Sequence, residues 1–269
     1  MARSFDQPGP STYNTSMPEP ASSELQASVK RYLETDLMLG VKTAPLRAGS
    51  APNSAAAPPG KKLQALTADE LKQRQEALAE LDTSKVKGCT KCKLCETRTN
   101  TVFGQGHAAA RLVFVGEAPG HDEDMKGLAF IGRAGQLLTK MIAAMGLSRE
   151  EVFICNILKC RPPNNRDPAP DEISSCWPYL DEQLRIIAPE VIVALGKPSA
   201  QTLLRTTQGI GALRGQWHEY FTSGSPSMGE PTALMPTYHP AYLLRSPGEK
   251  AKAWSDLKLV MARLGLPIP

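Results

Sequence analysis

The sequence predicts a three-layer α/β/α domain built around a central, mostly parallel sheet. Three apolar, β-branched runs lead to this prediction, at residues 112–116 (LVFVG), 152–158 (VFICNIL) and 191–196 (VIVALG). Segments with helical spacing separate them, and apolar strands that alternate with amphipathic helices are typical of parallel sheets covered on both faces. Because such sheets bind ligands at the carboxyl ends of their strands, we expect the loops after Val115, Ile157 and Leu195 to line the functional site.

Residues 1–66 precede this pattern and are rich in Pro, Ala and Ser. With few aromatic side chains they cannot bury enough surface to offset the entropy of ordering, so we expect a disordered extension. Within it, residues 22–39 show the apolar stripe of a short helix, with side chains four positions apart at Leu25, Val29, Leu33 and Leu37. This segment is either a transient helix of a linker or a helix that binds a protein partner.

Residues 67–269 are predicted to form the functional domain. Thr67 and Glu70 have capping-box spacing, and the Ala- and Leu-rich stretch after them predicts a helix to about Asp82. Further helices are expected at 133–146, 171–188 and 198–205, later strands at 218–222 and 232–240, and a closing helix at 246–265.

The composition excludes a membrane protein but does not by itself identify a function. Apolar residues make up 41% of the 269 positions. No apolar run reaches the roughly 20 residues that span a bilayer, and the N-terminus lacks the hydrophobic core of a secretory signal. We therefore expect a cytoplasmic protein, and a monomer. The formal net charge of +4 is compatible with nucleic-acid binding without indicating it.

Four of the six cysteines have the spacing of a metal or cluster site. Cys89 and Cys92 form a CxxC pair, and Cys160 and Cys176 follow far downstream. Thiols stay reduced in the cytosol, and four thiolates from separate segments can hold either a zinc ion or an iron–sulfur cluster. The alternative is that these cysteines pack as small apolar side chains. Of the remaining two, Cys155 lies in an apolar run and Cys95 is close enough to the pair to be a rival ligand.

Four motifs occur in order along the same segment: GEAPGHDED at 116–124, GLAFIGRAGQLL at 127–138, NILKCRPPNNR at 156–166 and HPAYLLR at 239–245. Together with the four cysteines between and around them, they resemble the motifs of the family 4, iron–sulfur type of uracil-DNA glycosylase, over about residues 85–264. The resemblance implies an enzyme of base excision repair that flips uracil out of DNA, hydrolyses its N-glycosidic bond and leaves an abasic site. It also implies a 4Fe–4S cluster on the four cysteines and uracil-containing DNA as partner.

The resemblance assigns four residues to the uracil base. Asn156 matches the asparagine that pairs with the uracil edge, and its amide can accept from N3–H while donating to O4, which cytosine cannot satisfy. Phe130 matches the ring that stacks on the flipped base. Glu123 matches an acidic residue beside C5, where a thymine methyl would clash, and Ala118 adjoins the base. The competing interpretations are a structural asparagine, a core phenylalanine and a solvated acidic loop.

Two further residues match catalytic positions of the family. Glu117 matches the family's acidic residue near the anomeric carbon, where a carboxylate can stabilise the positive sugar of the transition state and position water. His239 matches the histidine that donates to uracil O2 as the base departs, and a neutral imidazole supplies that donor. A related family has aspartate where this chain has Ala118, so the group that orients the attacking water stays open. The backbone amides of residues 116–120 are also candidates for binding uracil O2 or a phosphate.

DNA contacts are expected around the same loops. Leu243 matches the apolar wedge that fills the vacated base stack, and Arg245 is a candidate phosphate contact. A cationic rim is expected to extend from Arg161, Arg166, Lys159 and Arg133.

Three other kinds of protein fit the sequence less well. A branch of the same superfamily cross-links to the abasic site through a histidine in an inserted basic loop, but residues 156–176 contain no histidine. A non-catalytic DNA-binding module braced by zinc would not need Glu117, Asn156 and His239. A phosphate- or nucleotide-binding protein would need the P-loop lysine or the dinucleotide fingerprint, and GEAPG has neither.

Overall fold

The computed structural model describes residues 66–222 and 231–268. One six-stranded sheet runs through them, with strands β1 (Gln105–Gly106), β2 (Leu112–Gly116), β3 (Phe153–Asn156), β4 (Val191–Leu195), β5 (His218–Tyr220) and β6 (Thr232–Thr237). Their order across the sheet is β1-β3-β2-β4-β6-β5. The four inner strands are parallel, while the edge strands β1 and β5 are antiparallel to their neighbours. The predicted mostly parallel sheet is therefore confirmed.

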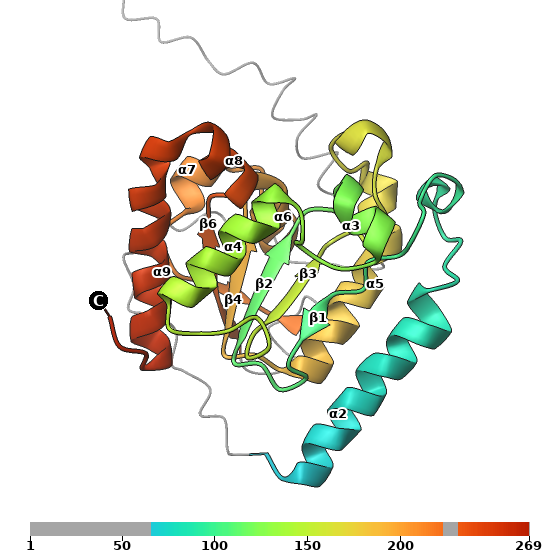
Figure 1. The fold of residues 1–269 in the computed structure, drawn as a ribbon, viewed down its shortest axis with the longest axis horizontal. Helices are drawn as coiled ribbons and strands as arrows, with labels where there is room; N and C mark the ends of the chain where they lie inside the picture. Colours follow the sequence, from blue (N-terminus) through green and yellow to red (C-terminus); the bar gives the residue numbers. More distant parts are fainter. Residues whose placement is uncertain (1–65, 223–230, 269) are drawn as a thin grey trace, which may run out of the picture. The chain divides into compact units, whose positions relative to one another are not determined.

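Helices connect the strands and cover the sheet (Figure 1). The longer ones are α2 (Ala68–Glu80), α4 (Arg133–Ala144), α5 (Pro170–Ile187), α6 (Lys197–Leu204) and α9 (Lys250–Leu264). Short helices are α3 (His121–Lys126), α7 (Ile210–Leu213) and α8 (Pro240–Arg245). A π-helical turn, η1 (Leu81–Val86), continues α2, and 3-10 turns occur at η2 (Lys93–Glu96), η3 (Pro163–Asn165) and η6 (Pro247–Glu249).

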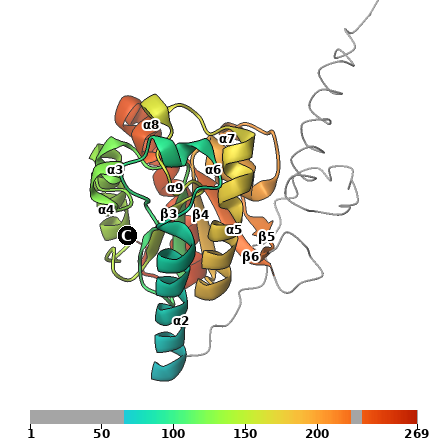
Figure 2. The ribbon, with the colours of Figure 1, turned by 90° about the vertical axis from the view of Figure 1, so that its right-hand side faces the viewer.

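The helices form two layers with the sheet between them. Leu138 and Ile142 of α4 share one apolar core with Phe114 of β2 and with Leu257 and Val260 of α9. On the other face, the Ser199 hydroxyl of α6 donates to the Val115 carbonyl at 2.6 Å. Figure 2 shows α4 and α5 on opposite sides of the strands. The predicted three-layer α/β/α architecture is confirmed.

Strand register aligns the carboxyl ends of the parallel strands. Gly116 at the end of β2 lies opposite Asn156 at the end of β3, and Leu195 of β4 lies opposite Thr237 of β6. The loops that follow these strands therefore leave the sheet at one edge. This is the edge at which the sequence places the site.

Most predicted elements are present, with small differences. The helix expected from Thr67 begins with the predicted capping box, in which the Glu70 amide donates to Thr67 Oγ1 at 3.2 Å and the Thr67 amide donates to the Glu70 carboxylate at 2.8 Å. The two-residue strand β1 and the one-turn helix α7 were not predicted, because neither is long enough to show a period.

Residues 1–65 fall outside the described residues, and with them the expected disordered extension and its helix at 22–39. None of the helices that the structure describes is long and apolar enough to cross a membrane.

Candidate active site

A cleft with a volume of about 790 Å³ opens where the four parallel strands end. Each strand contributes lining residues through the loop that follows it: Glu117 to Gly120 after β2, Asn156 at the end of β3, Leu195 to Pro198 after β4, and Tyr238 and His239 after β6. The predicted base-reading and catalytic side chains, far apart in the sequence, therefore share one cavity.

Asn156 lies at the closed end of this arrangement. Its side chain is 1% exposed, and its Oδ1 atom has no hydrogen-bond partner among the described residues. A buried amide oxygen without a donor is costly in free energy and points to a ligand that supplies one. Gly116 leaves the space that this amide needs, because a Cβ there would lie 2.3 Å from Asn156 Oδ1 and 2.5 Å from the Phe130 ring.

Phe130 is held in a left-handed backbone conformation, with φ at 52°. This conformation is unfavourable for a residue with a large side chain and persists only where its surroundings fix it. The Arg149 guanidinium does so by donating to the Phe130 carbonyl at 3.1 Å and to the Ala129 carbonyl at 2.8 Å. The Phe130 ring centroid lies 5.7 Å from that of His239, so the two rings border the same space.

His239 caps the N-terminus of α8 with one of its two ring nitrogens. Nδ1 accepts a hydrogen bond of 3.1 Å from the Ala241 amide, which leaves the proton of a neutral imidazole on Nε2. Burial, and then the positive charge of Arg245, lower the pKa of His239 to about 4. At neutral pH the side chain is therefore a neutral donor through Nε2, the form that the sequence analysis expects.

Glu117 is partly buried in the cleft wall. Burial, followed by repulsion from the Asp167 carboxylate, raises the pKa of Glu117 to about 7. A carboxyl group that titrates near neutral pH inside a cleft is a common property of catalytic acids and bases. Ala118, the next residue, also lines the cleft and offers only a methyl group there.

Glu123 lines the cleft as expected, but its carboxylate is already bound by the backbone. Oε2 accepts from the Gly120 amide at 3.1 Å, and Oε1 accepts from the Ile131 and Gly132 amides at 2.9 Å each. These bonds tie α3 to the turn that carries Phe130. Any contact with a base is therefore made by a side chain that also holds the cleft together.

The arginines expected at the rim differ in their exposure and in whether other side chains already bind them. Arg245 and Arg166 line the cleft, and Arg133 is exposed at the start of α4. Arg166 forms a bidentate ion pair with Glu172, at 2.5 and 2.9 Å. Arg161 donates to Asn165 at 2.8 Å and lies 3.3 Å from the His121 ring.

Two expected DNA contacts are wrong in this structure. Lys159 is 1% exposed and lies in the core, where its ammonium donates to the Asn156 carbonyl at 2.8 Å and to Gln183 Oε1 at 2.5 Å, so it is not part of a cationic rim. Leu243 is also 1% exposed, because α8 turns this face inward toward α4, and it is not an exposed wedge. The neighbouring Leu244 is 37% exposed.

The four predicted ligand cysteines occupy one neighbourhood. Burial raises the pKa of both Cys160 and Cys176. Nearby thiolates raise it further: those of Cys92 and Cys89 act on Cys160, and those of Cys160 and Cys92 act on Cys176. Three of the four sulfurs accept hydrogen bonds: Cys89 from the Tyr179 hydroxyl (3.2 Å), Cys160 from Arg98 (3.1 Å) and Cys176 from the Lys159 amide (3.3 Å). Within the described ranges, no three Cys, His, Asp or Glu side chains are grouped tightly enough for a single metal ion.

Four residues around the cleft were not singled out from the sequence. Arg149 donates to the carbonyl of Phe130, which lies 19 positions earlier in the chain. Asp167, which raises the pKa of Glu117, directly follows the NILKCRPPNNR motif. Tyr238 and Tyr242 line the cleft on either side of His239. The sequence could have indicated the two tyrosines, because both lie within or next to the HPAYLLR motif.

The comparisons with known proteins agree with this geometry. Residues 103–258 match the model of the Uracil DNA glycosylase superfamily. The chain is 45% identical over 181 residues to the type-4 uracil-DNA glycosylase of Archaeoglobus fulgidus, covering 65% of this chain and 87% of that protein. For the type-4 enzyme of Thermotoga maritima the identity is 43%, covering 64% and 86%. A type-5 uracil-DNA glycosylase of Pyrobaculum aerophilum is 29% identical, covering 51% and 64%. The chain belongs to the Uracil DNA glycosylase superfamily and, within it, to the type-4 uracil-DNA glycosylases.

Proposed function

We propose that this protein hydrolyses the N-glycosidic bond of deoxyuridine in DNA, releasing uracil and leaving an abasic site for base excision repair. One observation carries the proposal: the buried, unpartnered Asn156 Oδ1 faces a cleft that also presents the Phe130 ring and a neutral His239. A base inside a duplex is out of reach of such a cleft, so the uracil must be extruded to enter it.

Asn156 is proposed to select uracil by its Watson–Crick edge. Its Oδ1 atom would accept the N3–H of uracil, and its amide nitrogen would donate to O4. Cytosine presents an acceptor and a donor in the opposite order and would leave both groups unsatisfied in a buried site. Penalties of this kind are the usual source of strong discrimination. Phe130 would stack on the face of the same base.

His239 and Glu117 are proposed to act on the two charges that develop during cleavage. Negative charge grows on the departing uracil, where the Nε2–H of His239 would donate to O2. Positive charge grows on the sugar, where an ionised Glu117 would stabilise it and help to orient water. With a pKa of about 7, Glu117 is ionised in about half of the molecules at neutral pH.

We propose that Cys89, Cys92, Cys160 and Cys176 hold a 4Fe–4S cluster with a structural role. The donor set suits it, because four thiol side chains are available and three of their sulfurs accept hydrogen bonds of the kind that surround cluster ligands. Burial raises the pKa of Cys176 to about 12, so a bound cationic centre would be needed to deprotonate it. A cluster would cross-link α5, the loop after β3 and the segment after η1.

Uracil release from a labelled oligonucleotide tests the function directly. The protein, purified without air, is incubated with single- and double-stranded DNA that contains one uracil, and alkaline strand cleavage reports abasic sites. Iron content and the visible spectrum are measured on the same sample. His239→Ala should lose release, whereas His218→Ala, a matched histidine that bonds the Leu213 carbonyl outside the cleft, should retain it. Tight binding of uracil-DNA without release would instead favour a non-catalytic or cross-linking protein of the same superfamily.

A further inference from the structure

Two tyrosines border the mouth of the cleft on either side of His239. Tyr238 precedes the histidine, and Tyr242 follows it in α8. Their ring centroids lie 5.0 Å apart with the planes inclined by 42°. Both side chains line the same cavity as Asn156 and Phe130, and the proposed function assigns neither of them a part in reading or releasing the uracil. The pair is therefore an aromatic surface next to the reacting nucleotide without an assigned role.

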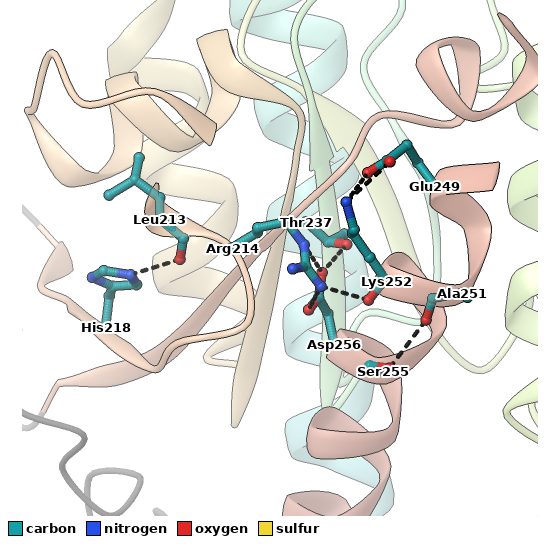
Figure 3. Close-up of polar contacts among 9 residues, drawn as sticks. All are labelled: Leu213, Arg214, His218, Thr237, Glu249, Ala251, Lys252, Ser255 and Asp256. Atoms are coloured by element: carbon teal, nitrogen blue, oxygen red, sulfur yellow. Dashed lines mark hydrogen bonds and ion pairs between the residues drawn. The ribbon is translucent and has the colours of Figure 1, made fainter. Parts of the chain in front are cut away.

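The Tyr238 ring is held in place from behind. The Arg214 guanidinium lies over it, 5.3 Å from the ring centroid. Arg214 is itself fixed by a bidentate ion pair with the buried Asp256 and by a 2.6 Å hydrogen bond to the Lys252 carbonyl. The Thr237 hydroxyl donates to the same Asp256 carboxylate at 2.6 Å, as Figure 3 shows.

This network orders the tyrosine before any ligand arrives. Asp256 comes from α9 and Thr237 ends β6, so the residue immediately before Tyr238 is anchored to the core (Figure 3). A side chain that is already ordered loses little conformational entropy when a ligand stacks on it. The ring is thus prepared as a contact surface.

Positive charges accompany the two rings. Lys197 and Arg245 line the same cavity, and both are exposed. Neither forms an ion pair with another side chain in the ranges that the structure describes. Aromatic faces flanked by free cations are the usual composition of a surface that binds single-stranded nucleic acid by stacking and phosphate contacts.

We propose that Tyr238 and Tyr242 form a stacking platform for the nucleobase adjacent to the extruded uracil, with Lys197 and Arg245 contacting the neighbouring phosphates. This inference rests on the proposed function, because it needs a uracil in the cleft beside His239. Extrusion removes a stacking partner from the adjacent base, and the platform replaces it. Since no complementary strand is required for that contact, the platform favours cleavage of uracil in single-stranded DNA.

The test is a double-mutant cycle between protein and DNA. The substrates are single-stranded oligonucleotides with one uracil, in which the base on its 5′ or its 3′ side is present or replaced by a tetrahydrofuran abasic analogue. Wild type, Tyr242→Leu and Tyr242→Phe are compared in single-turnover reactions over a range of enzyme concentrations. Each reaction yields a half-saturating concentration and a cleavage rate at saturation.

For wild type, removing the base on one side should raise the half-saturating concentration about 10-fold. Tyr242→Leu should show the same 10-fold increase on the intact substrate and no further increase when that base is removed. Tyr242→Phe, which keeps a ring, should restore the dependence on the neighbouring base. The effect should fall on the half-saturating concentration rather than on the rate at saturation. Leu259→Ala, an exposed change on α9 outside the cleft lining, serves as the control.

Two results would overturn the platform. In the first, Tyr242→Leu raises the half-saturating concentration equally on intact and abasic-flanked substrates, which would mean that the ring contacts the uridine itself or only supports α8. In the second, the half-saturating concentration does not change, which would mean that the ring makes no contact with the DNA. If Tyr242→Leu is unstable, Tyr238→Leu is used in the same cycle, and independent losses in both variants likewise reject the proposal. Absence of uracil release by wild type on every substrate would reject the proposed function instead, which keeps the two failures distinct.

Discussion

The ammonium group of Lys159 donates a 2.8 Å hydrogen bond to the main-chain carbonyl of Asn156 inside the core. A second bond from the same ammonium reaches Gln183 of α5, whose amide nitrogen donates to the Phe103 carbonyl at 2.9 Å. The end of strand β3 is thereby fixed to the helix that also carries Cys176. We therefore expect Lys159 to position the Asn156 amide that is proposed to bind uracil.

Lys159→Met should therefore impair base recognition more than stability. The substitution keeps the apolar stem but leaves two buried acceptors without a donor, while it also removes a costly buried charge, so we expect a change of less than about 1 kcal/mol in unfolding free energy. Misplacement of the Asn156 amide should lower the single-turnover rate about 10- to 100-fold and weaken inhibition by free uracil. Iron content is measured alongside, because Cys160 is adjacent.

Arg111→Met is the matched control for Lys159→Met. Arg111 also donates to a main-chain carbonyl, that of Leu264, at 3.0 Å, but it lies beside the amino end of β2, away from the cleft. The Arg111→Met variant should be less stable than wild type, and free uracil should inhibit it as strongly as it inhibits wild type. Inhibition of Lys159→Met at the wild-type level, with full iron content, would show that Lys159 does not position Asn156.

The contrast between Lys159 and Asn156 shows what the sequence could predict. Strands β2, β3 and β4 were predictable because strands buried on both faces are continuously apolar, and Asn156 was predictable because strand ends form the site. The burial of Lys159 was not predictable from the sequence. The residue lies beyond the end of β3, where no strand or helix period determines which way a side chain points.

The α8 leucines were ambiguous for a related reason. Leu243 and Leu244 are adjacent on a six-residue helix, and only packing against α4 decides which one is buried. Arg149 supports Phe130 across a separation of 19 positions, which no local pattern records.

The pH dependence of cleavage should report Glu117. Its raised pKa, about 7, means that the carboxyl is neutral below that pH and ionised above it. If the ionised form stabilises the sugar cation, the single-turnover rate should rise with pH and level off above about 8. His239 is already neutral across this range, with a pKa of about 4, and contributes no step. Glu117→Gln should cleave slowly, and its rate should not rise with pH. If the rate of this variant still rises with pH as in wild type, another group is responsible for the pH dependence.

Glu117→Gln should also change stability in a pH-dependent way. A carboxyl whose pKa is higher in the folded state than in the unfolded state favours folding at low pH and loses that contribution as pH rises through about 7. The variant should therefore be more stable than wild type at pH 8, by about 1–2 kcal/mol, since solvent screens part of the effect. At pH 4 the two proteins should have similar unfolding free energies. Chemical denaturation at both pH values measures the difference.

Glu123→Ala should cost stability in addition to any change in specificity. The carboxylate accepts three backbone N–H bonds that join α3 to the Phe130 turn, and loss of bonds to a charged group should lower the unfolding free energy by about 1–3 kcal/mol. Asp122→Ala on the same helix is the control, because the Asp122 carboxylate accepts no backbone hydrogen bond within the described part of the chain. If Glu123 also guards C5, the variant should release thymine slowly, opposite guanine first. Complete rejection of thymine by an otherwise active variant would leave Glu123 with the structural role alone.

Cys176→Ala should remove bound iron and destabilise the fold. The residue lies in α5 and would be one of four ligands that join separate segments, so its loss should release the cluster. Cys155→Ala is the control, because this buried cysteine of β3 is not one of the four proposed ligands. This variant should keep its iron at some cost in stability. Iron analysis, visible absorbance and thermal unfolding are compared for both variants. Stoichiometric zinc without iron in protein prepared without air would reject the cluster.

His239 and Asn156 should act on the same leaving group, and their effects should overlap. Both are proposed to contact the base whose negative charge grows only in the transition state. Removal of one such donor typically costs about 100- to 1000-fold in rate. His239→Ala should therefore slow single-turnover cleavage strongly while weakening DNA binding little, because phosphate contacts supply most of the affinity.

The double variant with Asn156→Ala should lose less than the product of the two single losses in rate. A base that is no longer held at its edge cannot present O2 to the Nε2–H of His239, so the second substitution removes an interaction already weakened by the first. Single-turnover rates of wild type, both single variants and the double variant measure the coupling. A wild-type rate in His239→Ala would exclude its role at the leaving group, and strictly multiplicative losses would mean that the two residues act on separate steps.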